Sequence, residues 1–309
     1  MNELSIIMYH YVRPLKDSKY PGIKGLELQK FKRQLDYVEE NYHVVTSDEL
    51  ISSTSIEGYK LPKNACLLTF DDGYRDHFDY VLPELIHRGL QGSFFPPAKC
   101  VTERSMLNVN KIHYILATCN NYEQLVKELE KLCLENGVDE SDLAIYRDDY
   151  FFPSRFDSGE VAYFKRMLQH VLEEAVTQKI LEELFQKYVK CDSIEIADKL
   201  YMTMNEIEKL IELGMYVGSH TYSHKWLNKL PKVAQEREID LSLDFLRLVG
   251  APTKEWIMCY PYGGYNSDTL NILMDRKCVV GLTTKPGIAN ITSRNRLELD
   301  RFDTNDLPQ

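Results

Sequence analysis

The 309-residue sequence has no apolar run that approaches the roughly 18 residues needed to cross a bilayer. It also has no recognisable secretory signal, because the apolar patch at residues 4–8 is too short and lacks a basic flank. The seven cysteines are scattered without a CxxC pair, which is typical of reduced, mostly buried thiols rather than of a disulfide framework. We therefore expect a cytoplasmic protein without a membrane span.

Basic residues are also scarce relative to acidic ones. The chain has 37 Lys and Arg against 47 Asp and Glu, which gives a net charge of −10. This balance argues against a nucleic-acid partner, since phosphate contacts require concentrated Lys and Arg. With 44% hydrophobic and 27% charged residues and no repeat or low-complexity tract, the composition is that of an ordinary globular protein.

Strand-like and helix-like segments alternate over residues 1–97 and again over residues 200–309. Repeated βα units predict a parallel sheet, either open or closed into a barrel. Between them, residues 98–199 show no strong strand signal, and residues 122–134 and 160–188 have helical periodicity. We interpret residues 98–199 as a helical insertion that packs on the barrel edge, or that serves as a substrate lid or dimer contact. The oligomeric state stays open.

Polar clusters follow four of the predicted strands, at residues 9–11, 71–73, 220–224 and 261–264. The carboxyl ends of parallel strands open onto one face, where catalytic groups gather. We therefore expect these four clusters to lie close together.

Asp71 and Asp72 come directly after the apolar run that begins at Ala65. An Asp-Gly turn is one interpretation, but two carboxylates at the end of a buried strand require a compensating cation. Neighbouring side chains on an extended chain point in opposite directions, so one carboxylate can bind a metal while the other faces substrate.

His220 and His224 stand four residues apart after another apolar run. They are either ordinary turn residues or, if the segment makes a helical turn, imidazoles that converge on one ion. One carboxylate and two histidines leave a coordination position open, as in hydrolytic zinc sites. The neighbouring Ser and Thr side chains are candidates for fixing the ring orientations.

Three segments together resemble the NodB-like polysaccharide deacetylases, which are carbohydrate esterases of family four. They are residues 69–74 (TFDDGY), 214–224 (GMYVGSHTYSH) and 260–263 (YPYG). The resemblance implies an α/β fold built as a distorted, incomplete (β/α) barrel. It further implies that Asp71 is the catalytic base and that the backbone N–H of Tyr262 stabilises the oxyanion. Asp72, His220 and His224 would hold a divalent metal, usually Zn²⁺, with Co²⁺ or another divalent ion as alternatives.

The chain departs from the family pattern at two places. Cys259 stands where the family usually has an arginine that orients the base, and no histidine follows His224 to protonate the leaving group. A branch of the family that looks circularly permuted carries an early histidine, and His10 is similarly placed. We therefore assign the general acid to His10 and the missing arginine to Arg301. A packed histidine and a surface arginine are the alternatives.

The resemblance implies a metal-dependent carbohydrate deacetylase, a hydrolase of non-peptide C–N bonds. Its substrate would be an N-acetylated, or less readily an O-acetylated, sugar or saccharide precursor. A cytoplasmic precursor, whether nucleotide-linked, lipid-linked or free, is expected over an exported polymer. Two other hypotheses stay open: a hydrolase of a non-sugar C–N bond on the same scaffold, and a non-catalytic carbohydrate-binding or regulatory protein.

Overall fold

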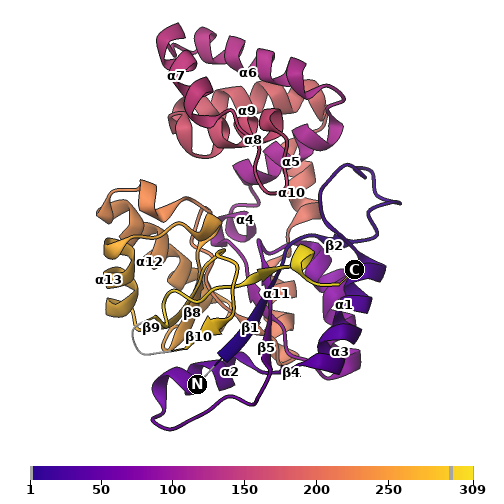
Figure 1. Cartoon of the computed structure of the whole chain (residues 1–309), viewed down its shortest axis with the longest axis vertical. Helices are drawn as coiled ribbons and strands as arrows, with labels where there is room; N and C mark the ends of the chain where they lie inside the picture. Colours follow the sequence, from indigo (N-terminus) through magenta and orange to yellow (C-terminus); the bar gives the residue numbers. More distant parts are fainter. Residues whose placement is uncertain (1–2, 292–294, 309) are drawn as a thin grey trace. The chain divides into compact units, whose positions relative to one another are not determined.

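The structure is a computed structural model that describes residues 3–291 and 295–308. It divides into two compact units (Figure 1). The barrel unit comprises Met1–Leu15, Gly25–Ser105 and Asp198–Gln309, and the helical unit comprises Lys16–Lys24 and Met106–Ala197. The division predicted from the sequence, with residues 98–199 as the insertion, differs from these units in two respects. Residues 16–24 cluster with the helical unit, and residues 98–105 and 198–199 cluster with the barrel unit.

Parallel strands form the centre of the barrel unit. Within the described residues the main sheet has seven strands, in the path β10–β1–β5–β6–β7 with β4 beside β5 and β11 beside β1. All of these pairs are parallel except β1 with β10. The strands are β1 (Glu3–Tyr9), β4 (His43–Val44), β5 (Ala65–Asp71), β6 (Ser93–Phe95), β7 (Tyr216–Val217), β10 (Ala289–Asn290) and β11 (Phe302–Asp303).

Two isolated bridges continue the strand order beyond this sheet. Ser219 pairs with Met258 and so links β7 to the parallel pair of β8 (Trp256–Cys259) and β9 (Cys278–Leu282). Leu282 pairs with Leu299, on the segment that leads into β11 beside β1. The circuit therefore depends on a single bridge at two places, which makes the barrel irregular. The predicted α/β fold with parallel strands is confirmed.

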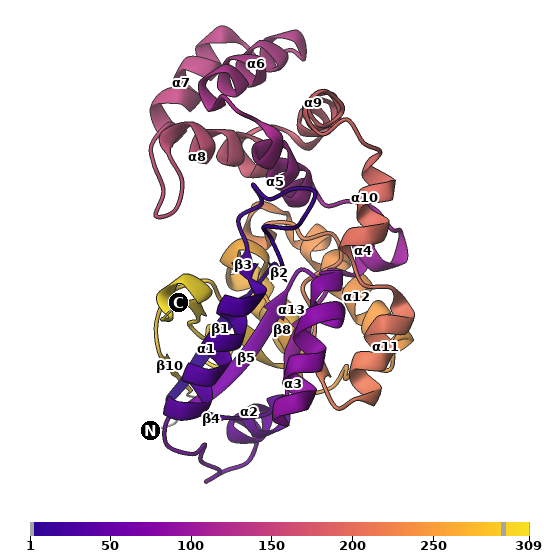
Figure 2. The same ribbon diagram turned by 90° about the vertical axis from the view of Figure 1, so that its right-hand side faces the viewer.

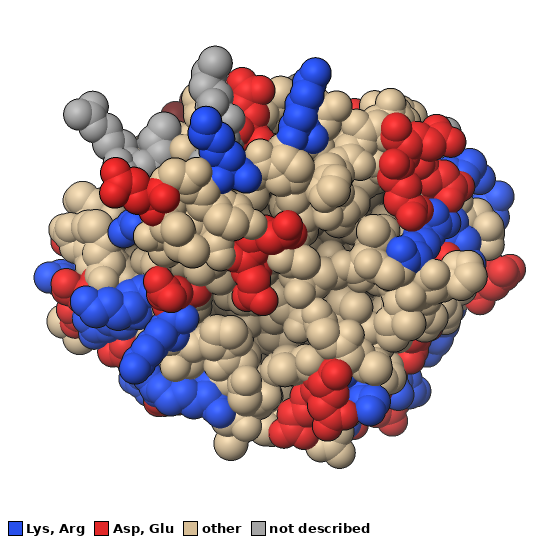
Figure 3. Space-filling view, turned by 90° about the horizontal axis from the view of Figure 1, so that it is seen from below, with Lys and Arg blue, Asp and Glu red and all other residues tan. Residues whose placement is uncertain are grey.

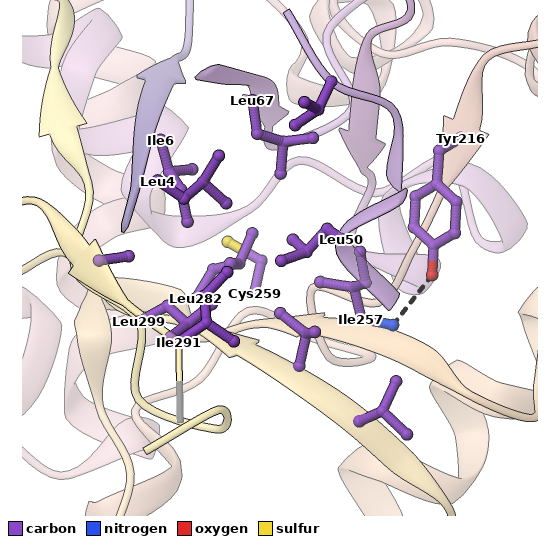
Figure 4. Packing of buried hydrophobic residues seen from close by; sticks show 14 of the residues in the cluster. Leu4, Ile6, Leu50, Leu67, Tyr216, Ile257, Cys259, Leu282, Ile291 and Leu299 are labelled. Carbon is purple, nitrogen blue, oxygen red and sulfur yellow. Dashed lines mark hydrogen bonds between the residues drawn. The ribbon is translucent and has the colours of Figure 1, made fainter. Parts of the chain in front are cut away.

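Side chains from all sides of this circuit meet in a buried core (Figure 4). Leu4 and Ile6 point inward from β1, and Ile257 and Cys259 point inward from β8. This alternation is the period of two that places every second strand residue on one face. Tyr216 also lies in the core, and its hydroxyl accepts a hydrogen bond from the backbone N–H of Ile257 at 2.9 Å.

Amphipathic helices cover the outside of the strands. In α1 (Leu28–Asn41) the buried residues Phe31, Leu35 and Val38 recur at helical spacing. Figure 2 shows α1 and α3 beside β1 and β5. The remaining helices of this unit are α2 (Ser47–Ser55), α3 (Leu82–Arg88), α4 (Ala98–Thr102), α11 (Met204–Glu212), α12 (Lys232–Leu248) and α13 (Ser267–Asp275), and β2 (Val12–Arg13) pairs with β3 (Leu26–Glu27).

The helical unit contains no strand among its described residues. The single long helix predicted over 160–188 is wrong, because the chain leaves helical geometry at Leu172 and Glu173. A π-helical turn, Met167–Val171, precedes the break and buries Met167 and Leu168. No Gly or Pro marks this position, so tertiary packing decided it. The helices are α5 (Asn108–Thr118), α6 (Tyr122–Glu135), α7 (Glu140–Tyr150), α8 (Gly159–Arg166), α9 (Glu174–Tyr188) and α10 (Ser193–Leu200), the last of which crosses into the barrel unit.

Among the described residues, no helix is both long and apolar enough to cross a membrane. The face seen from below in Figure 3 intersperses acidic and basic side chains around a broad uncharged area.

Candidate metal centre and active site

Asp71 is the last residue of β5, and Asp72 begins the turn that follows. Asp72 has a positive φ of 72°, and the next residue, Gly73, has a φ of 65°. A Cβ on Gly73 would lie 2.7 Å from the Cβ of Pro96, so this turn requires glycine. The tight turn is what allows two adjacent carboxylates to face different partners.

The two histidines lie on the loop that follows β7. Thr221 and His224 adopt positive φ angles of 62° and 58°, and the Thr221 hydroxyl accepts the backbone N–H of His224 at 3.1 Å. Glu238 on α12 accepts hydrogen bonds from both the backbone and the hydroxyl of Ser223. Strained backbone persists where the surroundings over-determine it, as at binding sites. The loop is therefore held in one conformation that turns both imidazoles inward.

Asp72, His220 and His224 come together in a buried cluster whose ligand atoms all lie within 4.8 Å of one another. Asp72 Oδ1 lies 3.4 Å from His220 Nε2 and 3.2 Å from His224 Nε2. These distances exceed the roughly 2.7–2.9 Å of a charge-assisted hydrogen bond. They match the spacing of about 3.3 Å between ligands that sit about 2.0–2.1 Å from a tetrahedral zinc ion. Oδ1 has no hydrogen-bond partner among the described residues. The donor set therefore fits a divalent metal.

Burial and neighbouring charges shift the pKa values of all three side chains. Burial by itself would raise the pKa of Asp72, but the facing His224 and His220 rings hold it well below its usual value. Burial lowers the pKa of His224, which favours the neutral ring that metals require. Burial by itself would lower the pKa of His220, but Cys259, Asp72 and Asp71 raise it well above its usual value, so a metal would displace a proton from this ring.

A backbone carbonyl, not a Ser or Thr side chain, orients His220. Its Nδ1 donates to the carbonyl oxygen of Cys259 at 2.7 Å, so in the neutral ring the lone pair lies on Nε2, which faces Asp72. The expectation that neighbouring hydroxyls fix this ring is therefore wrong. Ser219 instead pairs with Ser242, and Thr221 supports the loop backbone.

The carboxylate of Asp71 is paired with a guanidinium, and one of its oxygens also lies within 4.8 Å of a ring nitrogen of His220. Arg301 donates two hydrogen bonds to this carboxylate, from Nη1 to Oδ1 at 3.0 Å and from Nη2 to Oδ2 at 2.8 Å. Both residues are about 1% exposed, and Arg301 Nε donates to the carbonyl of Thr283 at 2.7 Å. Burial would raise the pKa of Asp71, but Arg301 and His220 outweigh it and hold the pKa at about 2.

His10 and Tyr262 complete the predicted set. His10 is half-buried, and its ring lies near enough to help lower the pKa values of both Asp71 and Asp72. The Tyr262 ring packs edge-on against His224, with centroids 4.7 Å apart, and its backbone has a positive φ of 57°. The structure thus brings all seven predicted residues into one region at the carboxyl ends of the strands. Their chemical roles stay predictions.

Two further residues at the site escaped the sequence analysis. The hydroxyl of Tyr74 donates to Asp72 Oδ2 at 2.7 Å. The buried His77 ring donates from Nε2 to the carbonyl oxygen of His10 at 2.8 Å and so supports the end of β1. Tyr74 lies inside the TFDDGY segment, but nothing in the sequence says which oxygen its hydroxyl meets.

Parts of the chain are similar in sequence to known proteins. Residues 155–278 match the family model described as polysaccharide deacetylase. This range contains His220, His224 and Tyr262 but neither Asp71 nor Asp72. YxkH of Bacillus subtilis (strain 168), which carries the name of a polysaccharide deacetylase, is 31% identical over 96 residues. The chain is similar to polysaccharide deacetylases over these parts of its length. The match covers 31% of this chain and 34% of that relative's length.

Several solved structures share the fold of this chain. The Streptococcus pyogenes deacetylase PplD, solved in complex with acetate, has a TM-score of 0.58 at 17% identity, with 97% of this chain and 92% of that chain covered. IcaB from Ammonifex degensii has a TM-score of 0.53 at 18% identity, with 92% and 85% covered. A de-N-acetylase from Aggregatibacter actinomycetemcomitans has a TM-score of 0.54 at 14% identity, with 98% and 95% covered.

Proposed function

We propose that the protein is a metal-dependent deacetylase that hydrolyses the N-acetyl group of a sugar or saccharide precursor. The observation that carries the proposal is the pairing of two differently held carboxylates. Asp72 has one oxygen at metal-ligand spacing from two imidazoles, while the adjacent Asp71 is buried and kept ionised by Arg301. A ligand and a spare base side by side are what hydrolysis by an activated water requires.

Asp72, His220 and His224 would hold the metal, with Zn²⁺ favoured by the nitrogen and oxygen donors and the tetrahedral spacing. When bound, a divalent ion at this position supplies a Lewis acid for the acyl oxygen and lowers the pKa of an attacking water. The three side chains leave at least one coordination position for these oxygens.

Asp71 would accept the proton of the attacking water. Its carboxylate is ionised at neutral pH because Arg301 stabilises the charged form against burial. The bidentate contact also fixes the plane of the carboxylate, so that the base is oriented before substrate arrives.

His10 and Tyr262 would act on the acyl group and its leaving amine. An amide leaves as an amine only when its nitrogen is protonated, and the His10 imidazole, directly after β1, would supply this proton. Such acid catalysis contributes typically about 10²–10⁴-fold. The backbone N–H of Tyr262 would stabilise the oxyanion, a contribution of about 3–4 kcal/mol for one such donor.

The aromatic residues around the centre support a saccharide substrate. Trp226 and Tyr262 stack with their ring planes 5° apart and their centroids separated by 4.8 Å. Both side chains are partly exposed beside His224, where a sugar ring can pack against them. A de-N-acetylase among the proteins that share this fold is consistent with the N-acetyl specificity.

An acetate-release assay over free, nucleotide-linked and lipid-linked N-acetyl sugars tests the proposal. We expect release that a chelator abolishes and Zn²⁺ or Co²⁺ restores. Asp71→Asn should retain the metal but lose turnover by orders of magnitude, whereas Asp240→Asn, an exposed position on α12, should behave like wild type.

Three outcomes would contradict the proposal. Release of product only from cyclic ureides would indicate a non-sugar C–N hydrolase. Sugar binding that Asp71→Asn leaves intact, with no acetate from any substrate, would indicate a non-catalytic protein. Wild-type metal content in each of the variants Asp72→Ala, His220→Ala and His224→Ala would show that these residues do not form a metal site.

A further inference from the structure

The two oxygens of Asp72 have different surroundings. Oδ1 faces His220 Nε2 and His224 Nε2 and has no hydrogen-bond partner among the described residues. Oδ2 accepts a hydrogen bond from the Tyr74 hydroxyl at 2.7 Å. One oxygen of the carboxylate is therefore available to bind a metal, and the other already accepts a hydrogen bond.

Tyr74 is itself held firmly in place. Its side chain is fully buried, and its ring stacks on Tyr11 with centroids 4.0 Å apart and on Tyr201 with centroids 6.3 Å apart. Both stacks are close to parallel, at 14° and 12°. The backbone of Met202 also donates to the carbonyl of Gly73 at 3.0 Å, which ties this turn to the Tyr201 segment.

We propose that Tyr74 is a positioning residue that makes Asp72 a one-oxygen metal ligand, and that the Tyr11–Tyr74–Tyr201 stack holds its hydroxyl for this purpose. The inference rests on the proposed metal site. It assigns a role to three tyrosines that do not themselves touch the metal. With Oδ2 engaged, the carboxylate cannot turn to chelate through both oxygens, so a coordination position stays open for the reacting oxygens.

Removing the hydroxyl frees the carboxylate to rotate. In Tyr74→Phe the ring stack is retained, but Oδ2 loses its donor and becomes available to the metal. We expect weaker and differently shaped coordination, because loss of a hydrogen bond to a metal ligand typically lowers metal affinity by about 10–100-fold.

The test measures Zn²⁺ affinity by competition with a chromophoric chelator, together with the visible absorption spectrum of the Co²⁺-loaded protein. Tyr74→Phe should weaken Zn²⁺ binding by about 10–100-fold, and its Co²⁺ bands should lose intensity as the coordination number rises. Tyr260→Phe is the matched control, since its hydroxyl is equally buried but donates to the carbonyl of Leu297 at 2.8 Å. Its affinity and spectrum should match wild type.

Wild-type affinity and spectrum in Tyr74→Phe would overturn the proposal while leaving the metal site intact. Absence of metal binding in the wild-type protein would instead overturn the proposed function. If Tyr74→Phe does not fold, the Zn²⁺ affinity of Tyr201→Leu is measured instead. This variant loosens the ring stack and keeps the hydroxyl of Tyr74. A several-fold loss of Zn²⁺ affinity supports the inference, and unchanged affinity contradicts it.

Discussion

At the residue scale, the contact between Asp71 and Arg301 is a fully buried ion pair. Each charge on its own would be costly to bury, and the two parallel hydrogen bonds offset that cost. The pair joins β5 to the last described segment of the chain, 230 residues away. It therefore serves both the proposed base and the closure of the barrel.

Arg301→Met should destabilise the fold strongly, because it leaves the Asp71 charge buried without a partner. We expect the free energy of unfolding to fall by about 3–5 kcal/mol at pH 7, as measured by urea denaturation. The matched control is Arg276→Met, which breaks a two-bond contact with Asp240 at the surface and should cost no more than about 1 kcal/mol. Equal losses of unfolding free energy in the two variants would show that the buried Asp71–Arg301 pair stabilises the fold no more than a surface ion pair.

His77 should make the protein sensitive to mild acid. Burial lowers the pKa of His77 to about 4, whereas an unfolded histidine titrates near 6.5. Between these values the unfolded chain binds more protons, so stability rises with pH and is lost as the pH falls from about 6.5 to 4. The loss should reach roughly 3 kcal/mol.

Urea denaturation across that pH range, with chelator present throughout, measures this effect. In His77→Gln the acid-induced loss should shrink, while the amide can still donate to the His10 carbonyl. His87→Gln, an exposed position on α3, should keep the wild-type profile. A His77→Gln profile that runs parallel to wild type would refute the assignment.

At the scale of elements, short strands position the proposed metal ligands. β7 has only two residues, Tyr216–Val217, and Gly218 follows them directly before the His220 loop. The main chain of β8 passes so close that a Cβ on Gly218 would lie 2.8 Å from the carbonyl oxygen of Ile257 and 2.6 Å from the Phe95 ring. Glycine is therefore what lets β7 approach β8.

Gly218→Ala should push β7 away from β8 and displace His220. We expect a destabilisation of about 1–3 kcal/mol from overpacking, together with weaker Zn²⁺ binding in a chelator competition. Gly214→Ala is the comparison, because its φ of 81° disfavours alanine but nothing lies within 4 Å of the added carbon. It should lose stability without losing metal affinity. Unchanged affinity in Gly218→Ala would argue against the close approach as a determinant of the site.

At the scale of the whole molecule, the chain leaves the barrel unit beside the site. The backbone of Lys99 donates to the carbonyl of Tyr222, within the histidine loop, at 2.8 Å. Met202, on the returning segment, donates to Gly73 in the aspartate turn. The two ends of the insertion are joined by an ion pair between Arg104 Nε and Asp198 Oδ1, at 2.6 Å. The barrel unit thus contacts the chain at both ends of the insertion.

Because the barrel core lies inside the strand circuit, the barrel unit should fold without residues 106–197. We expect a chain in which a Gly-Ser linker of about six residues replaces them to unfold cooperatively and to bind one Zn²⁺. The same shortened chain with Asp72→Ala should unfold similarly and bind none. A shortened chain that is unfolded in the presence of zinc would show that the helical unit completes the barrel.

The sequence by itself predicted the strand-helix alternation, the helical character of residues 98–199, and the two aspartates and two histidines that the structure brings together. These features depend on short-range patterns, namely apolar periodicity and polar residues placed directly after a strand. The His10 and Arg301 assignments came from resemblance and from the gaps in the family pattern, and only the structure shows that Arg301 reaches Asp71. The helix break at Leu172, the Cys259 carbonyl on His220 and the Tyr74 hydroxyl on Asp72 were decided by tertiary packing. Each depends on which atoms meet when distant segments fold together, and no local pattern encodes that.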